Sequence, residues 1–354
     1  VGDYTYNLAR EFARHGHEVA VVCRADARIR TDYEDIKVFP VVKRWDFGAA
    51  RPIVRLVREL GAEVVSLQYV PHGFHPKGLP FPLIHVMREV RRTGVRVQIF
   101  CHEVYVPFQG GMKNRVISFL TSRVTQGILK YCDSVATSID YYKRMILGLH
   151  PRNRNVGVIP IASNVPECPL GENERILLRR KIADDNETIV AFFGKRDIET
   201  SMQALRNLIQ KGYAIKVLFI GKVTEKTNDV SLPCYKTGVL DLKEISPYFQ
   251  VADILVLPEN DRFGCSFKSG SLIAGMRGGL PVVSGCGLLT SSSLEHGKNI
   301  IFADFENVAQ LERVLKPLVE DSDMRRRIGE NARMQVQNIS WVNTCAQYES
   351  LLNS

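Results

Sequence analysis

The sequence predicts an α/β protein made of two doubly wound domains in tandem. Apolar runs of strand length alternate with helical patterns twice along the 354 residues, a length that suffices for two domains of ordinary size. Several runs are apolar almost throughout, such as 252–258 (ADILVLP) with its one charged residue Asp253, and this is typical of parallel strands covered on both faces. A Pro-containing passage, 158–171 (VIPIASNVPECPLG), separates the two series and is typical of a linker.

The first domain, residues 1–160, opens on a helical pattern at 4–15 with no strand before it. A parallel sheet whose first crossover begins on a helix lacks its first strand, so we expect further residues ahead of Val1. The turn at 194–200 in the second domain is unusually short, so we expect that residues are missing from this segment as well. The strands predicted in the first domain lie at 17–24, 63–70, 95–102 and 134–139.

The second domain, residues 161–338, repeats the alternation of strands and helices. A last helical stretch, 339–354, is expected to pack back on the first domain. Two doubly wound domains in tandem imply a ligand in the cleft between them. The strands predicted in the second domain lie at 188–194, 215–221, 234–239, 252–258, 281–285 and 299–304.

The positive charge of the chain is concentrated in its first half. Residues 1–160 carry 24 Lys and Arg against 14 Asp and Glu, whereas residues 161–354 carry 23 against 24. A basic half fits a lipid surface, a phosphorylated acceptor or nucleic acid, or it is simply a solvated face. Segment 110–132 places basic residues at helical spacing between apolar ones, as in a helix at a membrane interface or in a core-packing helix with a charged outer face. Of these partners we favour a lipid-linked or otherwise anionic molecule, and we expect no nucleic-acid partner.

The composition predicts a cytoplasmic protein, and membrane association stays open. The sequence has no apolar run of about 18 residues and no charged-then-apolar leader. Eight cysteines are scattered without C-x-x-C pairs, so we expect reduced core residues and no disulfide or zinc framework. They are Cys23, Cys101, Cys132, Cys168, Cys234, Cys265, Cys286 and Cys345.

The segment 263–284 (FGCSFKSGSLIAGMRGGLPVVS) is the most informative about function. It follows strand 252–258 and therefore lies beyond the carboxyl end of a strand, where open α/β sheets bind ligands. Free N–H groups at a helix start, glycine and one cation suit a phosphate or diphosphate. The alternative is an ordinary turn with Ser271 as the N-cap and Lys268 in solvent. The polar and glycine residues of the loop are Ser266, Lys268, Ser269, Gly270 and Ser271.

Several segments together resemble a glycosyltransferase of the GT-B fold, and most closely the retaining glycosyltransferase family 4. These segments are VGDYTYNLAREFARHGHEVAVV, FCHE, VADILVLP, EHGKNIIFAD and ISWVNTCAQYESLL, in that order. The resemblance implies two Rossmann-like domains that face each other across a cleft. It also implies sugar transfer from a nucleotide-sugar with retention, with the donor bound mainly by the second domain. The acceptor, a small molecule, glycan or lipid-linked saccharide, would be bound mainly by the first.

A leaving diphosphate gains negative charge as the glycosidic bond breaks, and fixed cations and N–H dipoles can stabilise it. We therefore expect neither a metal nor another cofactor. Lys268 is the first candidate for the cation, followed by Arg196 or Lys195 at the end of a strand. His102 would, by resemblance, lie near the reacting carbon as a catalytic residue. The donor-binding residues implied are Gly2, Lys195, Gly264, Ser266, Ser269, Gly270, Ser271 and Val239.

Tyr69 and Glu103, at neighbouring strand ends, are the candidate acceptor contacts. The family usually carries two glutamates around the donor loop, and Ala274 stands where the second, which holds the ribose, is expected. A match of the first glutamate to Asp261 requires an insertion. A G-x-S-x-[RK]-x-G-S-L form, which some branches carry, instead fits without gaps at Gly264, Ser266, Lys268, Gly270, Ser271 and Leu272.

Three other functions compete with this interpretation. A GT-A transferase would hold Mn²⁺ with Glu259 and Asp261, which follow a strand. A sugar-nucleotide epimerase shares the two-domain architecture, and an inactive sugar-nucleotide binder explains the lost glutamate. Asp321 and Asp323 precede a helix, so capping explains them. The pairs His15 with His17, and His72 with His75, are too sparse for a metal site without further ligands.

Overall fold

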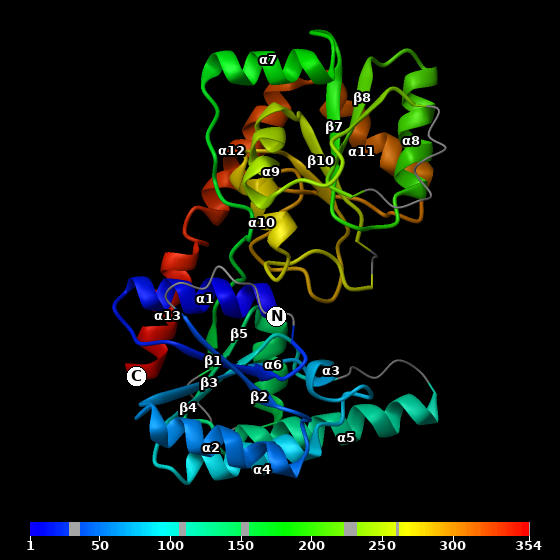
Figure 1. Cartoon of the computed structure of the whole chain (residues 1–354). Helices are drawn as coiled ribbons and strands as arrows, with labels where there is room; N and C mark the ends of the chain where they lie inside the picture. Colours follow the sequence, from blue (N-terminus) through cyan, green and yellow to red (C-terminus); the bar gives the residue numbers. More distant parts are fainter. Residues whose placement is uncertain (28–35, 106–110, 150–155, 223–231, 260–261, 354) are drawn as a thin grey trace. The chain divides into compact units, whose positions relative to one another are not determined.

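The computed structural model describes the whole chain except residues 28–35, 106–110, 150–155, 223–231, 260–261 and 354, and the side chain of residue 113 (Figure 1). The chain forms two compact units. Unit 1 comprises Val1–Pro160 and Trp341–Ser354, and unit 2 comprises Ile161–Ser340. The last helix is thus part of the unit that the first 160 residues build.

Unit 1 contains, in its described part, a two-stranded and a four-stranded parallel sheet. The first pairs β1 (Ala20–Arg24) with β2 (Lys37–Val42). The second has the order β3-β4-β5-β6. The four strands predicted here are confirmed, whereas β2 and β6 were missed. The strands of the larger sheet are β3 (Val64–Tyr69), β4 (Arg96–Cys101), β5 (Ser134–Thr137) and β6 (Val156–Val158).

Helices cover both faces of the strands of unit 1, with α1 and α13 over one face and α2 and α4 over the other (Figure 1). Tyr4 on α1 joins the first and last helices, because its hydroxyl lies 3.2 Å from that of Tyr348 and its ring lies 5.1 Å from that of Trp341. The helices are α1 (Gly2–Arg14), η1 (Phe47–Ala49), α2 (Ala50–Glu59), α3 (Pro71–Phe74), α4 (Phe81–Arg91), α5 (Met112–Leu129), α6 (Asp140–Leu149) and α13 (Trp341–Asn353).

Unit 2 is built, in its described residues, on one parallel sheet with the order β12-β11-β10-β7-β8-β9. The chain runs outward from β7 to β9 and then returns to β10 on the other side of β7. The strand order therefore reverses between β7 and β10, at a topological switch point. The strands are β7 (Thr188–Phe193), β8 (Ile215–Ile220), β9 (Cys234–Lys236), β10 (Ile254–Leu257), β11 (Val282–Ser284) and β12 (Ile301–Phe302).

Apolar cores lie on both faces of this sheet, which explains the continuously apolar strands. Ile189 and Leu255 face the core that α9, α10 and α12 cover, and Val190 and Val256 face the core under α8 and α11 (Figure 1). The helices are α7 (Glu172–Ile182), α8 (Glu199–Gln210), α9 (Leu242–Val251), α10 (Gly270–Arg277), α11 (Val308–Glu320) and α12 (Ser322–Val336).

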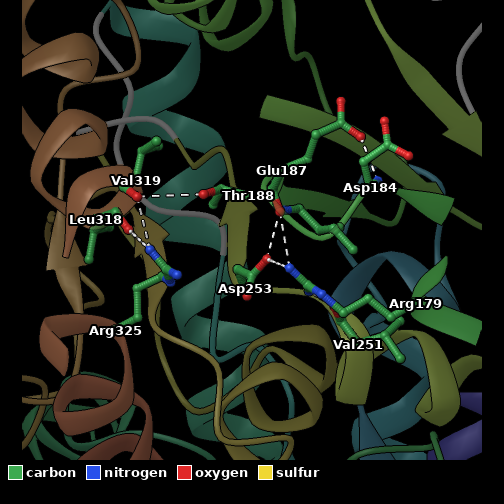
Figure 2. A network of polar contacts seen from close by, with 10 residues as sticks. Arg179, Asp184, Glu187, Thr188, Val251, Asp253, Leu318, Val319 and Arg325 are labelled. Atoms are coloured by element: carbon green, nitrogen blue, oxygen red, sulfur yellow. Dashed lines mark hydrogen bonds and ion pairs between the residues drawn. The ribbon is translucent and has the colours of Figure 1, made fainter. Parts of the chain in front are cut away.

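A polar network ties α7 to the amino ends of β7 and β10 (Figure 2). Arg179 lies 3.0 Å from the Asp253 carboxylate and donates to the Val251 carbonyl at 2.8 Å. The same carboxylate accepts from the Ile189 amide at 2.7 Å. The network therefore fixes the amino edge of the sheet, opposite the carboxyl edge where the candidate residues lie.

Candidate functional site

The candidate site of unit 2 lies at the carboxyl ends of β7, β10 and β11, at the switch point of the sheet. A Cβ on Gly194, just after β7, would lie 2.8 Å from Arg196 Nη1 and 3.8 Å from Ser271 Oγ. A Cβ on Gly285, just after β11, would lie 2.2 Å from the carbonyl oxygen of Glu259, which follows β10. The three strand ends and the start of α10 therefore converge, as expected for ligand binding in an open sheet.

The loop that precedes α10 is held in a fixed conformation by the segment that follows β11. Gly264 has φ +66°, and a Cβ there would lie 2.2 Å from the Gly287 nitrogen and 2.3 Å from Thr290 Oγ1. The Phe267 amide donates to Ser291 Oγ at 3.2 Å. Position 264 thus requires glycine both for its backbone conformation and for its lack of a side chain.

Helix α10 begins at Gly270, and Ser269 is its N-cap. Ser269 is extended, and its Oγ accepts from the Leu272 amide at 3.3 Å. The alternative that Ser271 caps this helix is wrong, because Ser271 lies inside the first turn. Among the described residues, the amides of Gly270 and Ser271 donate no backbone hydrogen bond, so they can donate to an anion.

The other two polar residues of the loop differ in exposure. Ser266 is buried, and its carbonyl accepts from the Ser269 amide at 3.0 Å, so it supports the turn. Lys268 is partly exposed, one residue before the cap. Ala274 is buried in the apolar core, and an alanine there offers no ribose contact.

Arg196 is largely buried beside the strand ends and is already paired. Its Nη2 lies 3.2 Å from Glu259 Oε1, and its Nη1 donates to the Phe193 carbonyl at 2.7 Å. Its Nε is buried and has no partner among the described residues. A buried unpaired N–H costs about 1–3 kcal/mol, so this group favours a ligand oxygen. Lys195 is exposed next to it.

The sequence analysis missed the segment that passes the N-terminus of α10. The Ile161 amide donates to the Phe267 carbonyl at 2.9 Å. A Cβ on Gly270 would lie 3.7 Å from the Ser163 Cα, and Ser163 is buried. The signal was present in the linker, where two polar residues, Ser163 and Asn164, interrupt an apolar stretch.

In unit 1, His102 follows β4 and is buried against aromatic rings. Its Nε2 lies 3.1 Å from Gln68 Oε1, and its ring centroid lies 4.7 Å from that of Tyr4 in the first turn of α1. Gly2 is the exposed first residue of the same helix. Glu103, the next residue after His102, is partly exposed. The predicted residues Gly2, His102 and Glu103 thus belong to neighbouring parts of unit 1.

Two other predicted contacts have contrasting environments. Tyr69 is fully buried, and its hydroxyl lies 3.1 Å from Thr125 Oγ1. Burial raises the pKa of the Tyr69 hydroxyl. Tyr69 is therefore a core residue of unit 1 in this structure, and its contact with the acceptor stays a prediction. Val239 is exposed in the loop after the edge strand β9, on the far side of β8 from the switch point.

The acidic residues named for the GT-A alternative are only partly described. Glu259 is paired with Arg196, and Asp261 lies outside the described residues. The Asp321 side chain accepts from the Asp323 and Met324 amides at 2.9 Å and caps α12, as expected.

The two units define the class of the protein, because two Rossmann-like α/β units in tandem are the GT-B fold. Residues 1–162 match the model of Glycosyltransferase Family 4, which confirms the resemblance seen in the sequence. No curated protein matches the chain in sequence. The comparisons together support a glycosyltransferase.

Three solved structures share the fold over nearly the whole chain. HepE of Anabaena, solved in complex with UDP, is 14% identical with a TM-score of 0.72, over 98% of this chain and 96% of HepE. A glycosyltransferase of Rickettsia africae is 13% identical with a TM-score of 0.73, over 99% and 93%. WaaG, a glycosyltransferase involved in lipopolysaccharide biosynthesis, is 13% identical with a TM-score of 0.67, over 99% and 95%.

Proposed function

We propose that this protein is a retaining glycosyltransferase that moves a sugar from a nucleoside-diphosphate sugar to an acceptor without a metal. The observation that carries the proposal is the convergence of the β7, β10 and β11 ends on the free amides of α10, with Lys268 beside them. An anion-binding helix start at a switch point suits a diphosphate. HepE was solved with UDP and with UDP-glucose, which makes UDP the first nucleotide to test.

In the proposed reaction, the bond between the anomeric carbon and the diphosphate oxygen breaks and negative charge collects on the diphosphate. The amides of Gly270 and Ser271, the Lys268 ammonium and the Nε of Arg196 stabilise that charge. The acceptor hydroxyl attacks from the face that the nucleotide leaves, and a donor phosphate oxygen takes its proton. By the resemblance, His102 is the candidate for contact with the donor sugar and Glu103 the candidate for contact with the acceptor.

Two alternatives keep the same binding site. An inactive binder of sugar nucleotides would retain the loop and the α10 amides but release no nucleotide, and the alanine at 274 is the observation that favours it. An epimerase would return an isomer of the sugar nucleotide in the absence of any acceptor. Chromatography of the products formed with and without acceptor separates all three functions.

The first test is a thermal-shift panel of UDP, GDP, ADP, TDP and CMP, each with and without EDTA. We expect one diphosphate to raise the midpoint in both conditions, since a ligand at about 100 times its Kd adds about 2.7 kcal/mol to stability. The quantity compared is the rise in thermal midpoint that the nucleotide causes, measured once with EDTA and once without it. A rise that EDTA abolishes would favour metal-bridged binding of the GT-A kind, and the absence of any rise would contradict the proposed site.

We also propose that α5 binds an anionic membrane surface, where a lipid-linked acceptor would lie. None of the described helices is long and apolar enough to cross a membrane. The exposed stripe of α5 carries Met112, Val116 and Phe119, which are 79%, 52% and 56% exposed. Arg123 lies over the Phe119 ring at 4.9 Å, and α5 contains no Asp or Glu. Exposed apolar residues beside basic ones on one helix face fit peripheral binding to anionic lipid.

We expect the protein to sediment with vesicles of phosphatidylcholine and phosphatidylglycerol, and not with phosphatidylcholine alone. The double variant Met112→Ser, Phe119→Ser should lose roughly tenfold in affinity, because it removes exposed apolar area without altering the core. Leu177→Ser with Met334→Ser is the matched control, since both side chains are exposed on unit 2. Equal losses in the two double variants would contradict a specific role for α5.

A further inference from the structure

A cluster of metal-ligating side chains lies where α13 packs on the end of α1, within unit 1. His15 Nδ1 is 3.5 Å from Cys345 Sγ and 3.5 Å from Glu349 Oε1. The thiol lies 3.9 Å from the same carboxylate oxygen. Among the described residues, this is the group whose ligand atoms all lie within 4.8 Å of one another. The sequence analysis had set aside the His15 and His17 pair for want of further ligands, and the fold supplies two.

We propose that His15, Cys345 and Glu349 bind one Zn²⁺ ion. Zinc takes thiolate at about 2.3 Å, imidazole at about 2.0–2.1 Å and carboxylate at about 2.0–2.2 Å in tetrahedral sites. These bond lengths separate neighbouring ligand atoms by about 3.4–3.6 Å. The three separations in the cluster match those values to within a few tenths of an ångström. A small inward movement of the carboxylate therefore completes three sides of the coordination shell.

Second partners for two of the ligands are also in place. His17 Nε2 lies 2.8 Å from Glu349 Oε1, and Glu11 Oε1 lies 3.9 Å from the other ring nitrogen of His15. A hydrogen bond such as that of His17 directs a ligating carboxylate. The Glu11 carboxylate lies beyond hydrogen-bond distance and only attracts a proton on that ring nitrogen electrostatically. Glu11 and Cys345 are buried, whereas His15 and Glu349 are partly exposed, so the metal has a route from solvent. A water molecule takes the fourth position.

The residue types select zinc over the harder cations. Thiolate and imidazole together favour Zn²⁺, whereas Mg²⁺, Ca²⁺ and Mn²⁺ prefer sets of oxygen ligands. A useful contrast is His85 with Glu89 on α4, where the ring nitrogen and carboxylate lie 3.7 Å apart. His85 is as exposed as His15, at 30% against 29% of the side chain. A histidine and a glutamate therefore lie equally close on α4, but no thiol accompanies them. The Cys345 thiol is the ligand that distinguishes the α1–α13 cluster as a metal site.

The ion would cross-link two segments that are far apart in sequence. His15 follows α1, and Cys345 and Glu349 lie one turn apart on α13. Metal binding free energy therefore becomes stability of the α1–α13 contact. The role is structural, because the diphosphate site belongs to unit 2, and Tyr4, which packs on His102, lies at the opposite end of α1 from His15. The inference does not depend on glycosyl transfer and can hold or fail separately from it.

The test uses the full chain, stripped of metal with a chelator and then titrated with Zn²⁺ or Co²⁺. We expect one equivalent to bind, a thiolate-to-Co²⁺ charge-transfer band in the near ultraviolet, and a rise in thermal midpoint that EDTA reverses. Cys345→Ser should abolish the band, and Glu349→Gln should weaken binding roughly tenfold or more. Cys286→Ser and His85→Gln are the matched controls and should bind as the unmodified protein does.

Two results with the unmodified and the Cys345→Ser proteins would overturn the proposal. One is binding of much less than one equivalent of either metal, and the other is a charge-transfer band that persists in Cys345→Ser. Because Cys345 is fully buried, its replacement can disturb folding. The partly exposed Glu349 gives an independent reading, and unchanged Zn²⁺ affinity in Glu349→Gln also contradicts the site. The midpoint rise caused by UDP should be equal in zinc-loaded and zinc-free protein, which separates this test from that of the donor site.

Discussion

Replacement of Lys268 by alanine is expected to lower kcat/KM for glycosyl transfer by roughly 10²- to 10³-fold and to weaken binding of the donor diphosphate. Lys268 is the residue before the α10 cap, two positions ahead of the first of the amides that we assign to the phosphates. A fixed donor aimed at developing charge is worth about this factor in other enzymes. Initial rates of nucleotide release and calorimetric titration with UDP measure the two effects separately.

The control for this experiment is a lysine of unit 2 that lies away from the strand ends. Lys298 is exposed and pairs with Glu295 at 2.8 Å, so Lys298→Ala removes one positive charge of the same unit without touching the loop. We expect it to retain donor affinity and turnover. Full transferase activity in Lys268→Ala would show that the diphosphate lies elsewhere. A loss of turnover with unchanged UDP affinity would restrict the role of Lys268 to the transition state.

The fold could be predicted from the sequence because both faces of the unit 2 sheet are covered. Strands such as β10 (Ile254–Leu257) are continuously apolar, and this pattern distinguishes them from amphipathic helices. The strands that were missed carry weaker signals. Strand β2 contains Pro40, which lowers strand propensity and is tolerated because β2 lies at a sheet edge. Strand β6 has three residues, too few for any periodicity.

The site was less predictable because its properties depend on contacts between distant residues. Arg196 looks like a free cation in sequence, yet Glu259, 63 positions later, pairs with it. Tyr69 ends a strand in sequence, but whether its hydroxyl reaches solvent depends on Thr125, 56 positions later. The zinc ligands show the same limit, because 330 residues separate His15 from Cys345. Strand ends can be found by local pattern, and the partners of their side chains cannot.

The second large effect is expected at Gly264, where alanine should destabilise the protein by about 3 kcal/mol or more. The new methyl group would lie 2.2 Å from the backbone nitrogen of Gly287, which cannot move aside as a side chain end can. The left-handed backbone adds about 1–2 kcal/mol for any residue with a Cβ. Urea unfolding measures the loss, and UDP titration of the folded fraction should show donor binding weakened at least roughly tenfold.

Gly270→Ala is the matched comparison, because it separates the shape of the loop from its contact with the ligand. A methyl group there meets nothing closer than the Ser163 Cα at 3.7 Å, and alanine in a helix is favoured over glycine by about 0.5–1 kcal/mol. We therefore expect unchanged or higher stability. If the diphosphate approaches the α10 amides closely, the methyl group should still weaken UDP binding. Undiminished UDP affinity in Gly270→Ala would mean that the glycine serves neither the fold nor the donor, and that the phosphates bind away from the start of α10.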